Sequence, residues 1–180
     1  MGWMVVERAH EAARASHELE AEAAHAGQGP ERAFVRALIG LDRRRFVAVY
    51  RASGSRGGAP EGHGAEGAWP ANRFSSVVGR DPGEVDVEGR SLIVVERSFP
   101  QPMTFDAYRG LHDRAAWCFE ENDIELVESY IRRDALRSVC LFAAPDADRV
   151  LFAHRTTRVP FVRLWPARLH GQPFAKTSSG

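Results

Sequence analysis

Apolar and β-branched residues alternate with polar ones most clearly in the second half of the chain. The segment Ser91–Phe99 (SLIVVERSF) has the composition of a β-strand, and Pro100 and Pro102 end it. Two further strands are predicted at Ile124–Arg132 and Arg137–Ala144, joined by a short polar turn of the kind found in hairpins. The second half therefore contains at least three predicted strands, two of them adjacent in the chain.

Two helices are predicted between these strands and beyond them. Thr104 has the side chain of an N-cap, and apolar residues recur at helical spacing from Phe105 to Phe119. Asp146 and Asp148 open a second helix, because carboxylates favour the positive end of a helix dipole. Pro160–Leu169 is predicted to be a last strand. The order strand, helix, strand, strand, helix, strand is that of an α+β, ferredoxin-like split βαβ unit.

Part of this pattern recurs in the first half of the chain. Three pairs of segments match in the same order: Phe34–Ala52 with Leu126–Ala144, Val5–Arg8 with Val94–Arg97, and Trp69–Ala71 with Trp165–Ala167. Matches in a conserved order indicate an internal duplication. We therefore expect a ferredoxin-like unit duplicated in tandem, with two sheets packed face to face as a pseudo-dimeric α/β barrel.

The two predicted copies differ in their loops, which sets the expected domain boundaries. Residues 1–80 are predicted to form a degenerate first copy, in which the glycine-rich stretch 53–68 replaces a helix with a mobile loop. Residues 81–90 are expected to be a linker, 91–169 the second copy, and 170–180 a frayed tail.

Composition and charge exclude some functions. The 24 acidic residues balance the 24 basic ones, so no overall field attracts nucleic acid or an anionic membrane. No stretch approaches the roughly 20 apolar residues that span a bilayer, and we expect a cytoplasmic protein. Cys118 and Cys140 lack CxxC spacing and are expected to be buried thiols. Motifs of common hydrolases and nucleotide-binding proteins are absent from the sequence.

The first half contains a series of histidines. His10, His17 and His25 are predicted to lie along one Ala/Glu-rich helix, too far apart to bind one ion together. A neighbouring glutamate such as Glu22 could complete a surface site with one of them. A solvated helix face explains the same pattern without a site.

Two residues of the second half are the candidate metal ligands. Glu96 is a carboxylate within an apolar strand, so it must face water, find a partner or line a cavity. An ion pair with Arg97, Arg137 or Arg163 is the alternative to a ligand role. His154 falls on the apolar face of the second predicted helix, where it is either a core histidine or a ligand for nickel, copper or zinc.

Four segments carry a family resemblance: Ile93–Pro100 (IVVERSFP), Ala115–Asp134, Val139–Val150 (VCLFAAPDADRV) and Val159–Ala167 (VPFVRLWPA). Together they resemble a family of small bacterial proteins with an uncharacterised domain, one of which is a Streptomyces nickel-binding protein. The resemblance covers about Leu92 to Leu169. It implies a ferredoxin-like fold that pairs into a dimeric barrel, with nickel binding in at least one member, and it implies no known reaction.

Three functional hypotheses follow. The first is a metal-binding protein, for nickel or another divalent transition metal, with Glu96 and His154 as ligands. The second is a cofactor-independent enzyme or small-ligand carrier that uses an apolar barrel cavity. The third is an interaction module without a site. In each case we expect no nucleic-acid or membrane partner, an intramolecular pseudo-dimer, and the possibility of a homo-oligomer.

Overall fold

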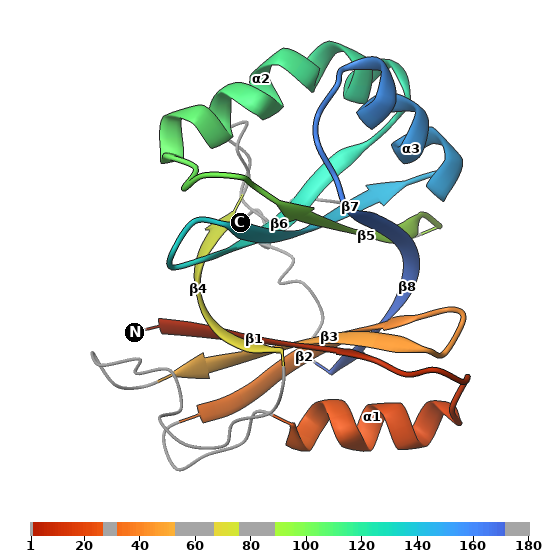
Figure 1. The fold of residues 1–180 in the computed structure, drawn as a ribbon. Coiled ribbons are helices and arrows are strands. Elements are labelled where there is room, and N and C mark those ends of the chain that lie inside the picture. The colour runs from red at the N-terminus through yellow and green to blue at the C-terminus, as the bar shows by residue number, and fades with distance from the viewer. Residues whose placement is uncertain (1, 27–31, 53–66, 76–88, 172–180) are drawn as a thin grey trace, which may run out of the picture. The chain divides into compact units, whose positions relative to one another are not determined.

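The computed structural model describes residues 2–26, 32–52, 67–75 and 89–171. Over these residues the chain forms eight strands and three helices (Figure 1). The strands are β1 (Gly2–Ala9), β2 (Arg32–Gly40), β3 (Arg45–Ala52), β4 (Ala68–Ser75), β5 (Ser91–Ser98), β6 (Glu125–Arg132), β7 (Arg137–Ala144) and β8 (Arg163–Gly171). The helices are α1 (Ser16–His25), α2 (Phe105–Glu121) and α3 (Ala147–Thr156).

These elements divide between two compact units. Unit 1 comprises the described residues within Met1–Asn72 and Ala167–Pro173, and unit 2 comprises those within Arg73–Pro166 and Phe174–Gly180. Strands β4 and β8 each contain a boundary between the units. The two units are described separately below.

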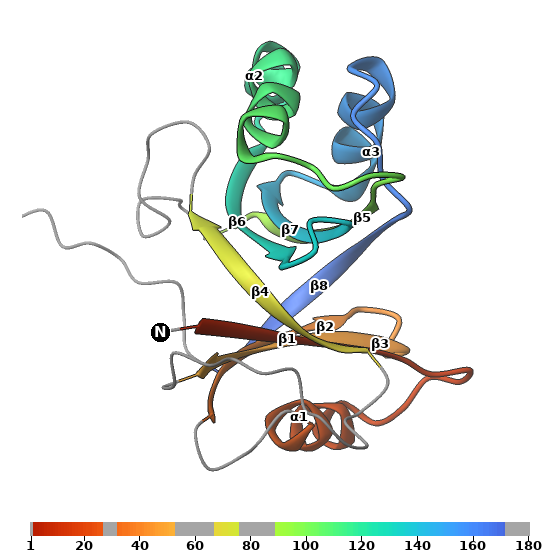
Figure 2. The same ribbon diagram turned by 60° about the vertical axis from the view of Figure 1, so that its left-hand side comes forward.

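Unit 1 is an antiparallel sheet with one helix against it. The strand order is β4, β1, β3, β2, followed by the last residues of β8, which pair with β2 from Gly40↔Ala167 to Arg36↔Gly171. Helix α1 lies against β2 and β3, as Figures 1 and 2 both show. Leu19 and Ala23 of α1 are fully buried in a core that includes residues of β1, β2 and β3. Burial of this apolar face holds the short helix in place.

Unit 2 contains the sheet order β5, β7, β6, also antiparallel. Helices α2 and α3 cover one face of it (Figure 2). Both helices begin at residues that accept a backbone hydrogen bond: Thr104 Oγ1 from the Ala107 N–H at 3.2 Å and Asp146 Oδ1 from the Arg149 N–H at 2.8 Å. The N-cap predicted at Thr104 is therefore confirmed, and Asp146, predicted to open the second helix, is the N-cap of α3.

The hairpins of the two units share their local geometry. Each contains a bulge, between Phe34 and Arg36 in β2 and between Leu126 and Glu128 in β6. Each also turns through a residue in the left-handed region, Arg43 with a φ of 56° in unit 1 and Ala135 with a φ of 58° in unit 2. The predicted strand pair in the second half is confirmed within one residue at each end.

The expected fold class requires correction. A ferredoxin-like split βαβ unit, duplicated in tandem as a pseudo-dimeric α/β barrel, is wrong: the described residues form mostly antiparallel sheet, with eight strands and only three helices. The predicted second copy is not self-contained either, because its last strand β8 passes into unit 1 and pairs there with β2. Alternating apolar residues identify a strand but not its pairing partner, and this is why the sequence pattern failed here. The strands and helices of the described residues remain compatible with the broad α+β class.

Some predictions fall outside the described residues. The glycine-rich stretch is described only at Gly67 and Ala68, the predicted linker only at Gly89 and Arg90, and the predicted tail only at His170 and Gly171. The domain boundaries placed there stay predictions.

Candidate functional site

Strand β5 places two charged residues on opposite faces of its sheet. Glu96 and Arg97 are successive, so their side chains project in opposite directions. Arg97 is 1% exposed and points to the face that α2 and α3 cover, where it contacts both helices. Glu96 is 7% exposed and projects from the other face.

Arg97 lies between two histidines on different helices. Its Nη1 is 3.1 Å from Nε2 of His112 on α2, and its Nη2 is 3.1 Å from Nε2 of His154 on α3. A guanidinium can only donate hydrogen bonds, so each Nε2 must accept through its lone pair. The Nδ1–H of His154 donates to the Val150 carbonyl oxygen at 2.8 Å, which fixes the tautomer and the orientation of this ring. We call Arg97, His112 and His154 the Arg97 cluster.

Both imidazoles of the Arg97 cluster are neutral at physiological pH. Burial and, to a smaller extent, the positive charge of Arg97 lower the pKa of His154 to about 4. Burial and Arg97 likewise hold the pKa of His112 well below its usual range. Removing an ionised imidazole from water is costly, and a neighbouring cation adds repulsion. The lone pair on Nε2 of each of the two rings is therefore available to accept a hydrogen bond.

Aromatic and polar side chains surround the Arg97 cluster. The ring of Tyr108 lies 5.0 Å from that of His112, and its centroid is 5.8 Å from the guanidinium carbon of Arg97. The Tyr108 hydroxyl donates to Ser129 Oγ at 3.0 Å and lies 2.9 Å from Cys140 Sγ. Burial and the Cys140 thiol raise the pKa of Tyr108. Cys118 and Cys140 are both buried free thiols, as predicted.

The opposite face of unit 2 carries buried carboxylates with donors of their own. Trp165 Nε1 donates to Glu96 Oε1 at 2.8 Å, and Arg163 Nη1 approaches Glu96 Oε2 at 3.4 Å. Glu128, which is 1% exposed, accepts from Arg73 Nη2 at 2.6 Å and from the Tyr130 hydroxyl at 2.5 Å. These donors stabilise the charged carboxylates without a metal ion.

The structure does not bring the two predicted ligands together. Glu96 projects from one face of β5, whereas His154 contacts Arg97 on the other face, so one ion cannot bind both. Across the described residues, no group of three or more His, Cys, Asp or Glu side chains is placed to hold a metal ion. The role of each residue as a separate ligand stays a prediction.

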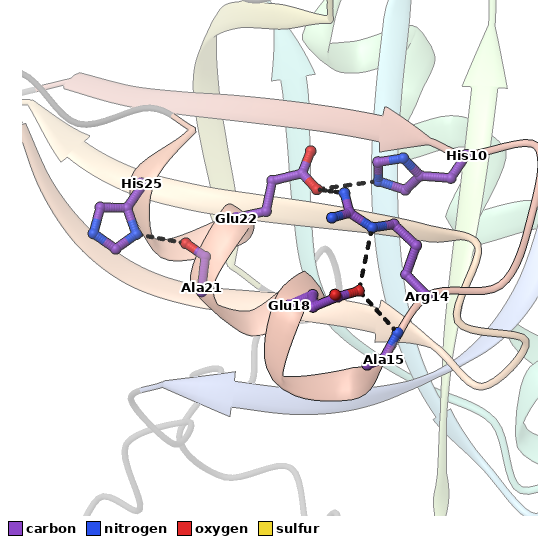
Figure 3. A network of polar contacts seen from close by, with 7 residues as sticks. All are labelled: His10, Arg14, Ala15, Glu18, Ala21, Glu22 and His25. Carbon is purple, nitrogen blue, oxygen red and sulfur yellow. Dashed lines mark hydrogen bonds and ion pairs between the residues drawn. The ribbon is translucent and has the colours of Figure 1, made fainter.

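Of the three histidines predicted to lie on one N-terminal helix, His17 and His25 lie on α1 as expected and His10 does not. His10 follows β1 and does not lie on a helix, because α1 begins only at Ser16. Its Nε2 is 3.4 Å from Glu22 Oε2, and the same oxygen is 2.7 Å from Arg14 Nη1 (Figure 3). His25 Nδ1 donates to the Ala21 carbonyl oxygen at 2.6 Å. The arginine would compete with a metal ion for Glu22, so this network is that of an ion-paired helix face.

Sequence reasoning missed the importance of Arg97 and did not place His112 among the candidate ligands. Arg97 was expected only as an alternative ion-pair partner of Glu96, a role that Arg163 has instead. The alternation of side chains along a strand could have predicted the position of Arg97. Ile93, Val95 and Arg97 lie on the same face of the strand, and Ile93 and Val95 are core residues under the helices. His112 shares the buried face of α2 with Tyr108, Ala115 and Phe119.

The fold and these contacts define a small α+β unit with a buried arginine between two neutral histidines. Residues 94–166, which include the whole Arg97 cluster, match the model of a protein family described as nickel responsive protein SCO4226-like. The family resemblance noted in the sequence is thereby confirmed over these residues. No curated protein matches the chain. Among the described helices, none is long and apolar enough to cross a membrane.

Proposed function

We propose that this protein binds a divalent transition metal, with nickel as the first candidate, and that binding takes place within residues 94–166. One observation carries the proposal, the match of these residues to a family described as nickel responsive. Imidazole nitrogen is a common ligand for nickel, and the matched residues contain two buried neutral histidines.

The geometry separates two versions of this proposal. Glu96 and His154 lie on opposite sides of the β5 sheet, so they belong to alternative sites. A site at Glu96 must compete with Trp165 and Arg163 for the carboxylate. A site at His154 must compete with Arg97 for the Nε2 lone pair. In the first version a substitution of Glu96 abolishes metal binding, and in the second a substitution of His154 does so.

The first experiment is isothermal titration of the untagged, metal-stripped protein with Ni²⁺, Zn²⁺ and Cu²⁺. An affinity tag would itself bind these ions, so it must be removed. Saturable binding of Ni²⁺ with a defined stoichiometry supports the proposal. Absence of binding for all three ions would overturn it.

Variants then show where the ion binds. Glu96→Gln and His154→Gln each remove one predicted ligand atom while keeping a polar side chain of similar size. The matched control is His17→Gln, which removes an exposed imidazole from α1. Loss of Ni²⁺ binding in the control alone would assign the ion to unit 1 and contradict the proposed location.

A further inference from the structure

Helices α2 and α3 each expose a large aromatic side chain on the side that faces away from the unit 2 sheet. Trp117 of α2 is 52% exposed, and Phe152 of α3 is 57% exposed. The buried residues of each helix, which include Ala115 in α2 and Val150 in α3, lie on the opposite side of the helix. Figure 2 shows the two helices side by side over the sheet. One exposed aromatic residue is ordinary, but two on the outer side of one helix layer form a candidate contact surface.

The surface of α2 around Trp117 is acidic. The exposed carboxylates of this helix outnumber its arginines: they are Asp106, Asp113, Glu120 and Glu121, against Arg109 and Arg114. Of these carboxylates only Asp106 forms an ion pair among the described residues, with Arg109 at 3.4 Å. The last turn of α2 contains no basic residue, although a helix dipole disfavours carboxylates at that end. This end of α2 therefore presents negative charge to solvent beside Trp117.

The surface of α3 around Phe152 is basic. Arg149 and Arg155 are exposed and lie three residues before and three residues after Phe152, so both flank it on the same side of the helix. Arg149 also approaches the N-cap residue Asp146 at 3.8 Å, whereas Arg155 forms no ion pair among the described residues. Each helix therefore combines an exposed aromatic ring with charge, and the charge is negative on α2 and positive on α3.

We propose that the outer side of α2 and α3, the α2–α3 face, is the contact surface between two copies of this protein. The face contains both members of a complementary pair, so a second copy matches it without any other partner. A twofold axis that runs between the helices places α2 of each copy against α3 of the other, and both contacts form at once. Trp117 then meets the partner's Phe152 and the partner's Arg155, through ring and cation–π contacts. Metal binding has no part in this contact, so the inference is independent of the proposed function.

The size of the α2–α3 face predicts a reversible dimer. A helix of 17 residues is about 25 Å long, and two helices packed about 10 Å apart are together about 20 Å wide. The face therefore offers about 500 Å² per copy and about 1,000 Å² in the dimer, which is the lower end of specific interfaces. We expect a Kd on the order of 10 μM.

The first test is sedimentation velocity of the untagged full chain between about 1 μM and about 200 μM. The natural protein is expected to change from monomer to dimer over this range, and a monomer throughout would overturn the inference. Trp117→Ser is expected to weaken the dimer by about tenfold or more. The matched control is Leu41→Ser, which removes another exposed apolar side chain, 59% exposed, from unit 1 and should leave the Kd unchanged. A dimer that Trp117→Ser does not weaken uses another surface and would also overturn the inference.

The second test exchanges the charges. Glu120→Arg/Glu121→Arg makes both helices basic, and Arg149→Glu/Arg155→Glu makes both acidic, so each variant alone is expected to stay monomeric at about 200 μM. An equal mixture of the two variants restores opposite charges across both contacts and is expected to form a mixed dimer. A mixture that remains monomeric, or single variants that dimerise like the natural protein, would overturn the proposed arrangement.

Circular dichroism and a thermal melt establish that each variant is folded. If a variant does not fold, hydroxyl-radical footprinting of the natural protein replaces it, at about 1 μM and about 200 μM. Trp117 and Phe152 are expected to be oxidised less at the higher concentration, whereas Leu41 is oxidised equally at both. Equal oxidation of Trp117 and Phe152 at the two concentrations would overturn the inference.

Discussion

Units 1 and 2 contain the same four residues, Val-Val-Glu-Arg, in strands β1 and β5. In both strands the glutamate accepts a hydrogen bond from a tryptophan indole, Glu7 from Trp69 at 2.7 Å and Glu96 from Trp165 at 2.8 Å. The arginine that follows differs: Arg8 is half-buried, whereas Arg97 is 1% exposed and lies between two histidines.

The helices explain this difference. In unit 1 the only fully buried residues of α1 are Leu19 and Ala23, so this helix offers the sheet small apolar contacts. In unit 2 both α2 and α3 pack on the sheet, and each contributes a buried histidine beside Arg97. The strand sequence is thus sufficient for the carboxylate–indole bond, but the environment of the arginine depends on residues far away in the chain.

The largest expected effect is in the Arg97 cluster. His154→Leu removes one neutral acceptor of a buried charge, and leaving a buried charged donor without its hydrogen bond costs about 3 kcal/mol or more of the free energy of unfolding. Replacing the charge as well, in Arg97→Met/His154→Leu, is expected to restore more than half of this loss. Arg8→Met in unit 1 is expected to change stability by less than about 1 kcal/mol. Urea unfolding measures the free energy of unfolding of all three variants. Equal losses in His154→Leu and in Arg97→Met/His154→Leu would contradict the explanation.

The pH dependence of stability is the next effect. The pKa of His154 is about 4 in the folded protein and about 6.5 in the unfolded chain. As the pH falls below about 6.5, the unfolded chain therefore takes up the proton before the folded protein does. Stability therefore falls as pH drops from about 6.5 to about 4, by up to roughly 3 kcal/mol for this residue. The lowered pKa of His112 acts in the same direction.

Urea unfolding at intervals between about pH 7 and about pH 4 checks this sign. His154→Gln should flatten the profile, and His17→Gln, which changes an exposed ring of unit 1, should leave it as it is. A profile that rises toward low pH would refute the assignment.

The carboxylate–indole bonds predict a smaller and equal effect in the two units. Trp69→Phe and Trp165→Phe each remove the N–H that donates to Glu7 or Glu96. Loss of one donor to a charged group costs about 1.5–3 kcal/mol. We expect the two variants to agree within about 1 kcal/mol in urea unfolding. A loss confined to Trp165→Phe would show that the resemblance between the strands is only one of sequence.

The smallest effect is expected in the two hairpin turns. Arg43 and Ala135 adopt left-handed φ values of 56° and 58°, which cost an ordinary residue about 1 kcal/mol and cost glycine little. Arg43→Gly, at an exposed position, should raise the melting temperature by a few degrees, on the order of 4 °C. Ala135→Gly should raise it less, because the Ala135 methyl group packs against the unit 2 core. A lower melting temperature for Arg43→Gly would contradict this account.

Local features of unit 2 could be predicted from the sequence because they depend on neighbouring residues. Thr104 and Asp146 were predicted at the N-terminal ends of α2 and α3, and the β6–β7 strands were predicted within a residue. The N-terminal helix was placed too early, since His10 and Arg14 lie before α1. Alanine and glutamate favour a helix over residues 8–25, but the pairing of β1 with β3 overrides that preference up to Ala9.

Long-range features could not be predicted in the same way. The pairing of β8 with β2 joins residues 167–171 to residues 36–40, and no local pattern specifies that partner. The Arg97 cluster likewise joins β5, α2 and α3. His154 was recognised as buried because its helix has a clear apolar face, but its contact with Arg97 required the packing of three elements.

The pairing of β8 with β2 also has a consequence for synthesis on the ribosome. Strand β2 can pair with β3 as soon as both have emerged, but Ala167–Gly171 are translated more than a hundred residues later. At ordinary rates of translation this interval is on the order of ten seconds. During that time the backbone amides and carbonyls of residues 36–40 lack their final partner, and the nascent chain presents a strand edge to chaperones or to neighbouring chains.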